Sequence, residues 1–278
     1  MKAMLPSFII IGAAKSATTW ITHKLQQNPA VFLPGPEPHY FSTEFHRRES
    51  WYQSIFQDAR PGQVIGEKSA DYLAHPEAPR RIAQRFPDIR LIVQLRNPIE
   101  RAYSDYCMLF RRGTVGGNPE NYLVRSRTSV PRFLDDGLYG QHLARFMEFF
   151  PREQLQVVLY DDIRAQPEAI IADVSRHIGV EPWLNGVAAS ERVKYKDAPM
   201  LPLGLRKLLQ PMKGLAQPLR DKPWFIAAHR RLARPVEYPP LTGNLRAQML
   251  DYYADDISNL SRLLGRDMGF WLNESASA

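Results

Sequence analysis

The sequence predicts a three-layer α/β fold in which a central, mostly parallel sheet is flanked by helices on both faces. Two observations predict this fold. Short apolar runs, typical of buried parallel strands, recur along the 278 residues, and a helical pattern follows most of them. Such strand–helix alternation builds a parallel sheet through right-handed crossovers. The length suits one large α/β domain or two small ones, and we expect a single domain over residues 1–278.

Four of the expected strands lie before residue 96. They are SFIII at 7–11, AVFL at 30–33, QVIGEKS at 63–69 and IRLIVQL at 89–95, of which the last has the clearest character of a central strand. Residues 18–28 carry apolar side chains at helical spacing, and residues 76–87 form a second expected helix. Asn97 and Pro98 predict the start of a third helix, because asparagine caps a helix and proline suits its first turn.

The second half of the chain continues the alternation. Residues 139–151 are amphipathic, residues 155–160 read as a strand, and residues 166–179 form a helix that a glycine ends. Residues 241–265 predict a long last helix with a cap signal before it and a glycine at its end. Residues 111–132, which are rich in Gly, Arg and Ser, are expected to form a loop.

The charge balance favours anionic ligands. Lys and Arg outnumber Asp and Glu by 36 to 29, which gives a formal net charge of +7 and a pI near 9.5. The single cysteine, Cys107, excludes an intrachain disulfide and a cysteine-rich zinc site, and we expect it to fill the core. The N-terminal apolar run is too short for a secretory signal and no segment has the length of a membrane span, so we expect a cytoplasmic protein.

Residues 8–20, FIIIGAAKSATTW, resemble a phosphate-binding loop. A strand, a turn containing Gly12 and the start of a helix place backbone N–H groups around an anion. The loop of kinases and nucleoside triphosphatases requires a second glycine before its lysine, whereas here that glycine is missing and Lys15 comes early. On this fragment alone, a lysine in a surface turn is an equal alternative.

Further segments carry a resemblance to a known family. They are GEKSADYL at 66–73, LIVQLRNPIERAYSDY at 91–106 and EPHYFS at 37–42, and the resemblance covers most of the chain. With the loop, these motifs resemble sulfotransferases that use 3'-phosphoadenosine 5'-phosphosulfate (PAPS), closest to the carbohydrate (heparan-type) branch and its bacterial relatives. The resemblance implies a P-loop-like fold, PAPS as co-substrate, and sulfuryl transfer to a hydroxyl or amine of a carbohydrate, lipid or natural-product acceptor.

The resemblance also implies which residues bind PAPS. The loop and the start of its helix grip the 5'-phosphosulfate, and the motif at 91–106 grips the 3'-phosphate. The residues expected at the two sites are Lys15, Ser16, Ala17, Thr18, Thr19, Trp20, Arg96 and Ser104. Lys15 can stabilise the charge that develops on the bridging oxygen as its bond to sulfur breaks. The alternatives are a surface ion pair for Arg96 and a serine bonded to its own helix for Ser104.

Glu67 is the candidate general base, because an attacking hydroxyl must lose its proton and the related enzymes have a glutamate in this E-K-[ST] motif. The alternative is a salt bridge from Glu67 to Lys15 or Lys68, and a nearby lysine would keep Glu67 ionised. We expect Lys68 to support the leaving group or to orient Glu67. His39 is the competing base, with a hydrogen-bonded packing residue as its alternative. The chain departs from many relatives at Pro36, where they have a lysine.

Residues 199–240 are rich in Pro, Leu and Arg. We expect surface helices there, with a lid over the acceptor or a membrane-facing surface as alternatives, and Lys194 and Lys196 are further candidates for phosphate contact. The competing functions are a P-loop kinase and a basic nucleotide- or nucleic-acid-binding protein without catalysis. We expect no nucleic-acid partner, because basic residues are not interleaved with stacking aromatic residues, and no metal, because no acidic motif follows the loop. The oligomeric state stays open.

Overall fold

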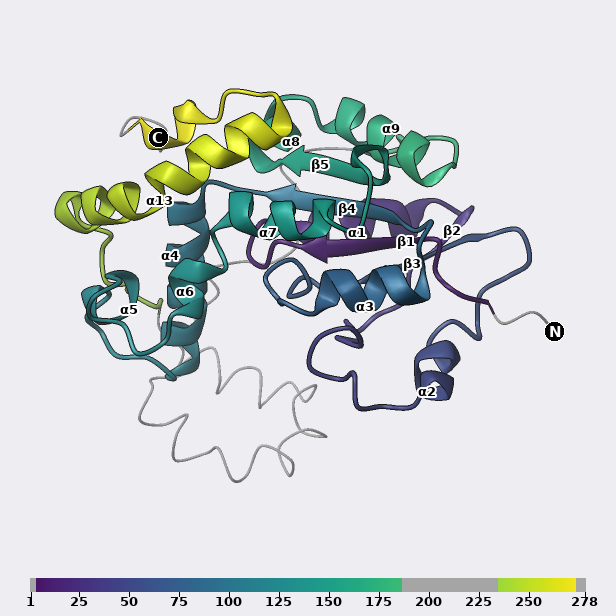
Figure 1. The fold of residues 1–278 in the computed structure, drawn as a ribbon, viewed down its shortest axis with the longest axis horizontal. Coiled ribbons are helices and arrows are strands. Elements are labelled where there is room, and N and C mark those ends of the chain that lie inside the picture. The colour runs from purple at the N-terminus through teal and green to yellow at the C-terminus, as the bar shows by residue number, and fades with distance from the viewer. Residues whose placement is uncertain (1–3, 187–234, 274–278) are drawn as a thin grey trace.

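The computed structural model describes residues 4–186 and 235–273. Five parallel strands form one sheet in the order β2-β3-β1-β4-β5. The strands are β1 Phe8–Gly12, β2 Val31–Phe32, β3 Val64–Lys68, β4 Arg90–Leu95 and β5 Leu155–Leu159. The first strand of the chain therefore lies in the middle of the sheet, and its carboxyl end meets those of β3 and β4 at one edge (Figure 1).

Helices cover both faces of the sheet, so the three-layer α/β prediction is confirmed (Figure 1). Phe8 and Ile10 point to one face, where they pack in an apolar cluster with residues of α1 (Thr18–Gln27), α8 (Tyr160–Ala165) and α9 (Pro167–Ile178). Ile9 and Ile11 point to the other face and its larger core. The helices contributing to that core include α2 Glu49–Ser54, α3 Ala78–Arg85, α4 Pro98–Arg112, α5 Glu120–Leu123, α6 Arg132–Asp135, α7 Tyr139–Met147 and α13 Gly243–Leu264.

The expected helix ends are confirmed where a cap signal was present. Asn97 Oδ1 accepts hydrogen bonds from the backbone N–H groups of Ile99 and Glu100, at 3.0 and 3.4 Å, and so fixes the start of α4 at the end of β4. Thr242 caps α13 in the same way, through a 3.3 Å bond from the N–H of Leu245. The Asn97 cap therefore places the start of α4 at the carboxyl edge of the sheet.

Several segments differ from the sequence expectation. Residues 111–132 are not a continuous loop, because α4 extends to Arg112 and α5 lies within the range. The expected strand at 155–160 is one residue shorter, because Tyr160 begins α8. The short helix α2 had no clear signal, and two 3-10 turns, η1 Arg152–Gln154 and η4 Gly269–Leu272, complete the described elements. Lys194, Lys196 and most of the segment expected at 199–240 lie outside the described residues, and its described part, residues 235–240, is not helical.

No helix within the described residues combines the length and the apolar character that crossing a membrane requires. Cys107 is partly buried and packs against the larger core, in agreement with its expected filling role.

Candidate active site

The loop that follows β1 is built on a tight contact at Gly12. Gly12 has φ of 149°, and a Cβ added there would lie 2.8 Å from Leu73 Cβ and 2.9 Å from the carbonyl oxygen of Ala70. The backbone N–H groups of Ser69 and Leu73 donate to the carbonyls of Ile10 and Ile11, at 3.1 and 2.8 Å. The loop after β1 and the turn after β3 are therefore packed against each other, and glycine is required at their contact.

The same loop holds two residues in left-handed backbone conformations. Lys15 has φ of 68°, and Ala17, the residue before α1, has φ of 63°. Left-handed geometry is unfavourable for residues with a Cβ, and such strain is concentrated at ligand sites. Among the described residues, the only other non-glycine residue with positive φ is His39, which also belongs to the candidate site.

A buried glutamine shapes this loop, and it was not expected from the sequence. The carbonyl of Gln94 in β4 accepts from the N–H of Ala13 at 2.7 Å, and its side-chain amide donates to the carbonyl of Ser16. No side chain caps the start of α1, and an uncapped helix start is a common binding site for an anion. A polar residue within the apolar run LIVQL was the signal that could have indicated this role.

The structure divides the expected phosphosulfate residues into two groups. Lys15, Ala17 and Thr19 are partly exposed, whereas Ser16, Thr18 and Trp20 are buried. Trp20 packs in the cluster between β1 and α1, so its side chain faces the core rather than a ligand. The backbone N–H groups of Ser16 and Trp20 donate to the carbonyls of Ala13 and Ala17, at 3.2 and 2.8 Å, so those of Thr18 and Thr19 are the better candidates for anion donors.

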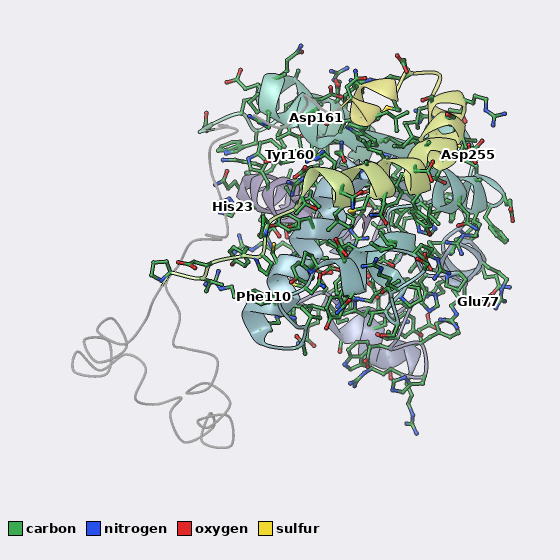
Figure 2. The ribbon with its side chains drawn as sticks, turned by 90° about the vertical axis from the view of Figure 1, so that its left-hand side faces the viewer. His23, Glu77, Phe110, Tyr160, Asp161 and Asp255 are labelled. Carbon is green, nitrogen blue, oxygen red and sulfur yellow. The ribbon has the colours of Figure 1, made fainter. Side chains whose placement is uncertain are left out.

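Lys15 lies between the loop and α4. Its Nζ atom is 3.1 Å from Met108 Sδ. Ser104 precedes Met108 by one helical turn, so both lie on the same face of α4. The loop lysine and the serine expected to contact the 3'-phosphate thus lie on the same side of the molecule. This side holds the carboxyl ends of the strands, and it faces the viewer in Figure 2.

Arg96 directly follows β4 at this edge. Its guanidinium lies 3.6 Å from a carboxylate oxygen of Glu100 and 5.2 Å from the centre of the Tyr160 ring, which is labelled in Figure 2. Glu100 also pairs with Arg246. The ion pair named as the alternative for Arg96 is therefore present, but it is shared, and a planar guanidinium at the end of a parallel strand is well placed for a phosphate.

Glu67 has surroundings that differ from those expected. Its side chain points to the larger core, where it is only 1% exposed. Its carboxylate accepts hydrogen bonds from three hydroxyl groups, those of Tyr52, Tyr72 at 2.6 Å and Ser69 at 3.0 Å. Burial raises the pKa of Glu67 to about 7, although these hydrogen bonds oppose the shift.

Two expectations about Glu67 are therefore wrong. Its carboxylate has hydroxyl partners rather than Lys15 or Lys68, and its pKa is raised rather than held low by a lysine. The physical reason is strand alternation, because successive side chains of β3 point to opposite faces of the sheet. Its role as base stays a prediction, and its burial counts against direct contact with an acceptor.

Glu37 is the carboxylate that the sequence interpretation missed. It pairs with Lys68, its Oε2 accepts from the N–H of Ala70 at 2.9 Å, and its side chain is 31% exposed. Lys68 therefore orients Glu37 instead of Glu67. The glutamate of EPHYFS was part of the quoted motif, so the signal was present, but attention went to the motif at 66–73.

His39 lies next to Glu37 and is paired with an acid. Its Nδ1 atom is 2.7 Å from Asp71 Oδ1, and the other Asp71 oxygen accepts from Ser42 at 2.6 Å. The hydrogen bond with Asp71 raises the pKa of His39, which favours the imidazolium form. Glu37, His39 and Asp71 offer ligand atoms within 4.8 Å of one another, and all three side chains are partly exposed.

Comparisons with known proteins agree with this geometry. A model described as "Sulfotransferase family" matches residues 36–184. The chain is 28% identical over 296 residues to the bifunctional heparan sulfate N-deacetylase/N-sulfotransferase 3 of Mus musculus, covering 97% of this chain and 31% of the relative. It is 28% identical to the heparan sulfate glucosamine 3-O-sulfotransferase 3B1 of the same species, covering 96% of this chain and 65% of the relative. The chain thus spans less than two thirds of these curated relatives.

A solved structure supports the fold. The sulfotransferase from Alicyclobacillus acidocaldarius superimposes with a TM-score of 0.70 at 22% identity, covering 97% of this chain and all of that chain. The match includes the sheet and the helices on both faces, so it supports the same P-loop-like architecture.

Proposed function

This chain belongs to the sulfotransferase family, and we propose that it transfers a sulfuryl group from PAPS to a hydroxyl or amine of a carbohydrate-type acceptor. The observation that carries the proposal is the meeting of a strained lysine loop, an uncapped helix start and Arg96 at one edge of a parallel sheet. These groups are cationic or N–H donors, which fit an anionic nucleotide. The curated relatives named above are an N-sulfotransferase and a 3-O-sulfotransferase, which supports both acceptor groups.

The donor half of the site would act by charge. The acceptor atom attacks sulfur, and the bond from sulfur to the bridging oxygen breaks, so that adenosine 3',5'-bisphosphate leaves with that oxygen. Lys15 and the N–H groups at the start of α1 face this developing charge, and such preorganised donors stabilise a transition state more than a ground state. Arg96, with the α4 face that carries Ser104, would hold the 3'-phosphate.

The acceptor half of the site would remove the proton. Glu67 is too buried to meet an acceptor, and the raised pKa of His39 favours its protonated form. Glu37 is partly exposed, and its partners Lys68 and the N–H of Ala70 hold its orientation. We therefore propose Glu37 as the general base, and Lys68 as the cation that orients it.

Transfer and binding assays test the function. Enzyme is incubated with ³⁵S-labelled PAPS and a panel of desulfated glycosaminoglycans, simple alcohols and amines. Labelled glycan is the expected product. Isothermal titration against adenosine 3',5'-bisphosphate, ATP and single-stranded DNA separates the sulfotransferase from a kinase and from a nucleic-acid-binding protein. Preference for ATP or DNA would contradict the proposal.

Arg96 provides a test of nucleotide recognition. We expect Arg96→Ala to lower the affinity for adenosine 3',5'-bisphosphate by roughly 10- to 100-fold, the effect of losing one charge-assisted contact. The affinity for adenosine 5'-phosphosulfate, which lacks the 3'-phosphate, should fall much less. Arg164→Ala, which removes an exposed arginine from neighbouring α8, is the control. Equal losses for the two nucleotides would show that Arg96 does not read the 3'-phosphate.

Metal removal provides a second test, because Glu37, His39 and Asp71 have the residue types of a metal site. We expect transfer to continue after dialysis against EDTA, since the ammonium group of Lys68 is paired with Glu37 and would repel a cation. The measurement compares treated enzyme with enzyme resupplied with Mg²⁺, Mn²⁺ or Zn²⁺. Activity that disappears with EDTA and returns with one of these ions would assign the cluster to that metal.

A further inference from the structure

We infer that Glu67 is a positioning residue whose buried carboxylate fixes the backbone of residues 37–42, the segment that carries Glu37 and His39. The inference rests on the proposed function, and it assigns Glu67 a role other than proton transfer. It starts from the observation that the donors around Glu67 are themselves bonded to this segment.

Two relays connect the carboxylate to the segment. In the first, the N–H of His39 donates to Ser69 Oγ at 3.0 Å, and Ser69 Oγ donates to Glu67 Oε1 at 3.0 Å. In the second, the N–H of Phe41 donates to the Tyr72 hydroxyl at 3.1 Å, and that hydroxyl donates to the same Oε1 atom at 2.6 Å. Each hydroxyl accepts from the backbone and donates to the carboxylate, so Glu67 sets the direction of both relays.

A third contact joins the carboxylate to α2. The Tyr52 hydroxyl donates to Glu67 Oε2, and the Tyr52 ring stacks on Tyr40, with 4.4 Å between their centroids. Tyr40 lies between the two residues whose N–H groups enter the relays. The segment is thus held through two backbone N–H groups and one side chain, and every path ends on one carboxylate.

The segment needs such support because its backbone is strained. His39 has φ of 52°, a left-handed conformation that costs free energy unless its surroundings impose it. The residue also carries the imidazole that contacts Asp71, and Glu37 precedes it by two residues. If the relays were lost, relaxation of His39 would move Glu37 relative to Lys68 and to the loop after β1.

A carboxylate suits this position because it only accepts hydrogen bonds. Three hydroxyl donors converge on its two oxygen atoms, and a side chain without acceptors would leave all three unpaired in the core. Glutamine can keep both relays. Its amide oxygen would accept from Ser69 and Tyr72, while its amide nitrogen would donate to the Tyr52 hydroxyl, which can also accept.

Matched variants separate positioning from proton transfer. We expect Glu67→Gln to lower kcat/KM for the acceptor by at most about 10-fold, since the contacts are retained with a weaker acceptor. Glu67→Leu, of similar volume and without acceptors, should lower it by roughly 100-fold or more, the effect of displacing the reacting groups by about 1 Å. Ser69→Ala and Tyr72→Phe, which interrupt one relay each, should give intermediate losses. Affinity for adenosine 3',5'-bisphosphate should stay unchanged in all four.

A control variant separates positioning from simple stabilisation of the fold. Tyr253→Phe also removes a buried hydroxyl. This hydroxyl donates to the carbonyl of Leu134 at 2.8 Å and takes no part in the relays. It should lower Tm and leave kcat/KM unchanged. If Ser69→Ala and Tyr72→Phe behave like this control, Glu67 only stabilises the fold. If Glu67→Gln is as inactive as Glu67→Leu, the carboxylate itself takes part in the reaction. Either result overturns the inference.

Hydrogen exchange provides a readout that does not depend on activity. The N–H groups of His39 and Phe41 should lose protection in Glu67→Leu and keep most of it in Glu67→Gln, as measured by mass spectrometry of peptides covering 37–42. Unchanged exchange in Glu67→Leu would contradict the inference. If the wild-type chain transfers no sulfuryl group to any acceptor, the proposed function fails, while exchange still shows whether Glu67 holds the segment.

Discussion

Replacing Lys15 with alanine is expected to lower turnover by roughly 10²- to 10³-fold, the typical effect of removing one preorganised electrostatic donor. Lys15 is held in a left-handed conformation at the turn before α1, with its ammonium group 3.1 Å from Met108 Sδ. This placement is fixed before the substrate arrives, so little reorganisation is required as negative charge develops on the leaving oxygen. The largest loss should therefore appear in kcat, measured under saturating PAPS.

The binding of product distinguishes this role from simple charge attraction. The bisphosphate has no sulfuryl group, so its affinity should fall much less in Lys15→Ala than kcat does. Arg60→Ala removes a positive charge from an exposed position and serves as the control for net charge. Wild-type turnover by Lys15→Ala would remove the lysine from the mechanism, and equal losses in kcat and in bisphosphate affinity would limit it to nucleotide binding.

The second large effect is expected at Glu37. Removal of a general base costs roughly 10²- to 10⁴-fold in rate, and Glu37→Gln should fall in this range when the acceptor is below saturation. Glutamine keeps the volume and can still accept from the N–H of Ala70, but it cannot take a proton. Glu44→Gln removes the acid of the surface pair with Arg47, just after segment 37–42, and it should leave activity unchanged. Activity of Glu37→Gln near that of wild type would exclude Glu37 as the base.

The same experiment compares the other two candidates. His39→Asn should lower the rate much less than Glu37→Gln, because hydrogen bonding to Asp71 raises the pKa of His39 and favours a form that cannot accept a proton.

The pH dependence of activity is an independent check. A base must be deprotonated, so a His39 base would make activity rise as pH increases through its raised pKa. A Glu67 base would give the same rise near its pKa of about 7. If activity rises with pH in this way and one substitution, at His39 or at Glu67, abolishes the rise, the substituted residue is the base.

The sequence was sufficient for the strands of the sheet and for the strand–turn–helix geometry after β1, because both depend on local patterns. Apolar runs predicted β1, β3, β4 and β5, and the cap formed by Asn97 predicted the start of α4. The strand order, which places β1 between β3 and β4, depends on contacts between distant segments, and the short α2 depends on packing by Tyr52. Neither leaves a periodic signal.

The acceptor half was harder to predict because its geometry depends on which side of a strand each residue faces. Glu67 and Lys68 are neighbours in the sequence and have different partners in space, a core of hydroxyl groups for one and Glu37 for the other. Strand alternation alone would have separated them. The raised pKa of Glu67 could not be predicted, because it depends on how deeply α2 and the 69–73 turn bury the carboxylate.

The contact at Gly12 bears on how this enzyme could be redesigned. The turn after β3 touches the loop after β1 at distances that leave no space for a methyl group, and two backbone hydrogen bonds join them. Substitutions within 69–73 that add volume or shift the backbone would therefore change the placement of the donor as well as that of the acceptor, and selection for a new acceptor through them would carry a cost in nucleotide affinity. Segment 37–42 is held to the turn through the N–H groups of His39 and Phe41 and carries Glu37, so it should be kept as well. Libraries aimed at acceptor choice should vary the partly exposed Glu44 and the exposed Phe45, which follow that segment, and leave the segment, the turn and Gly12 intact.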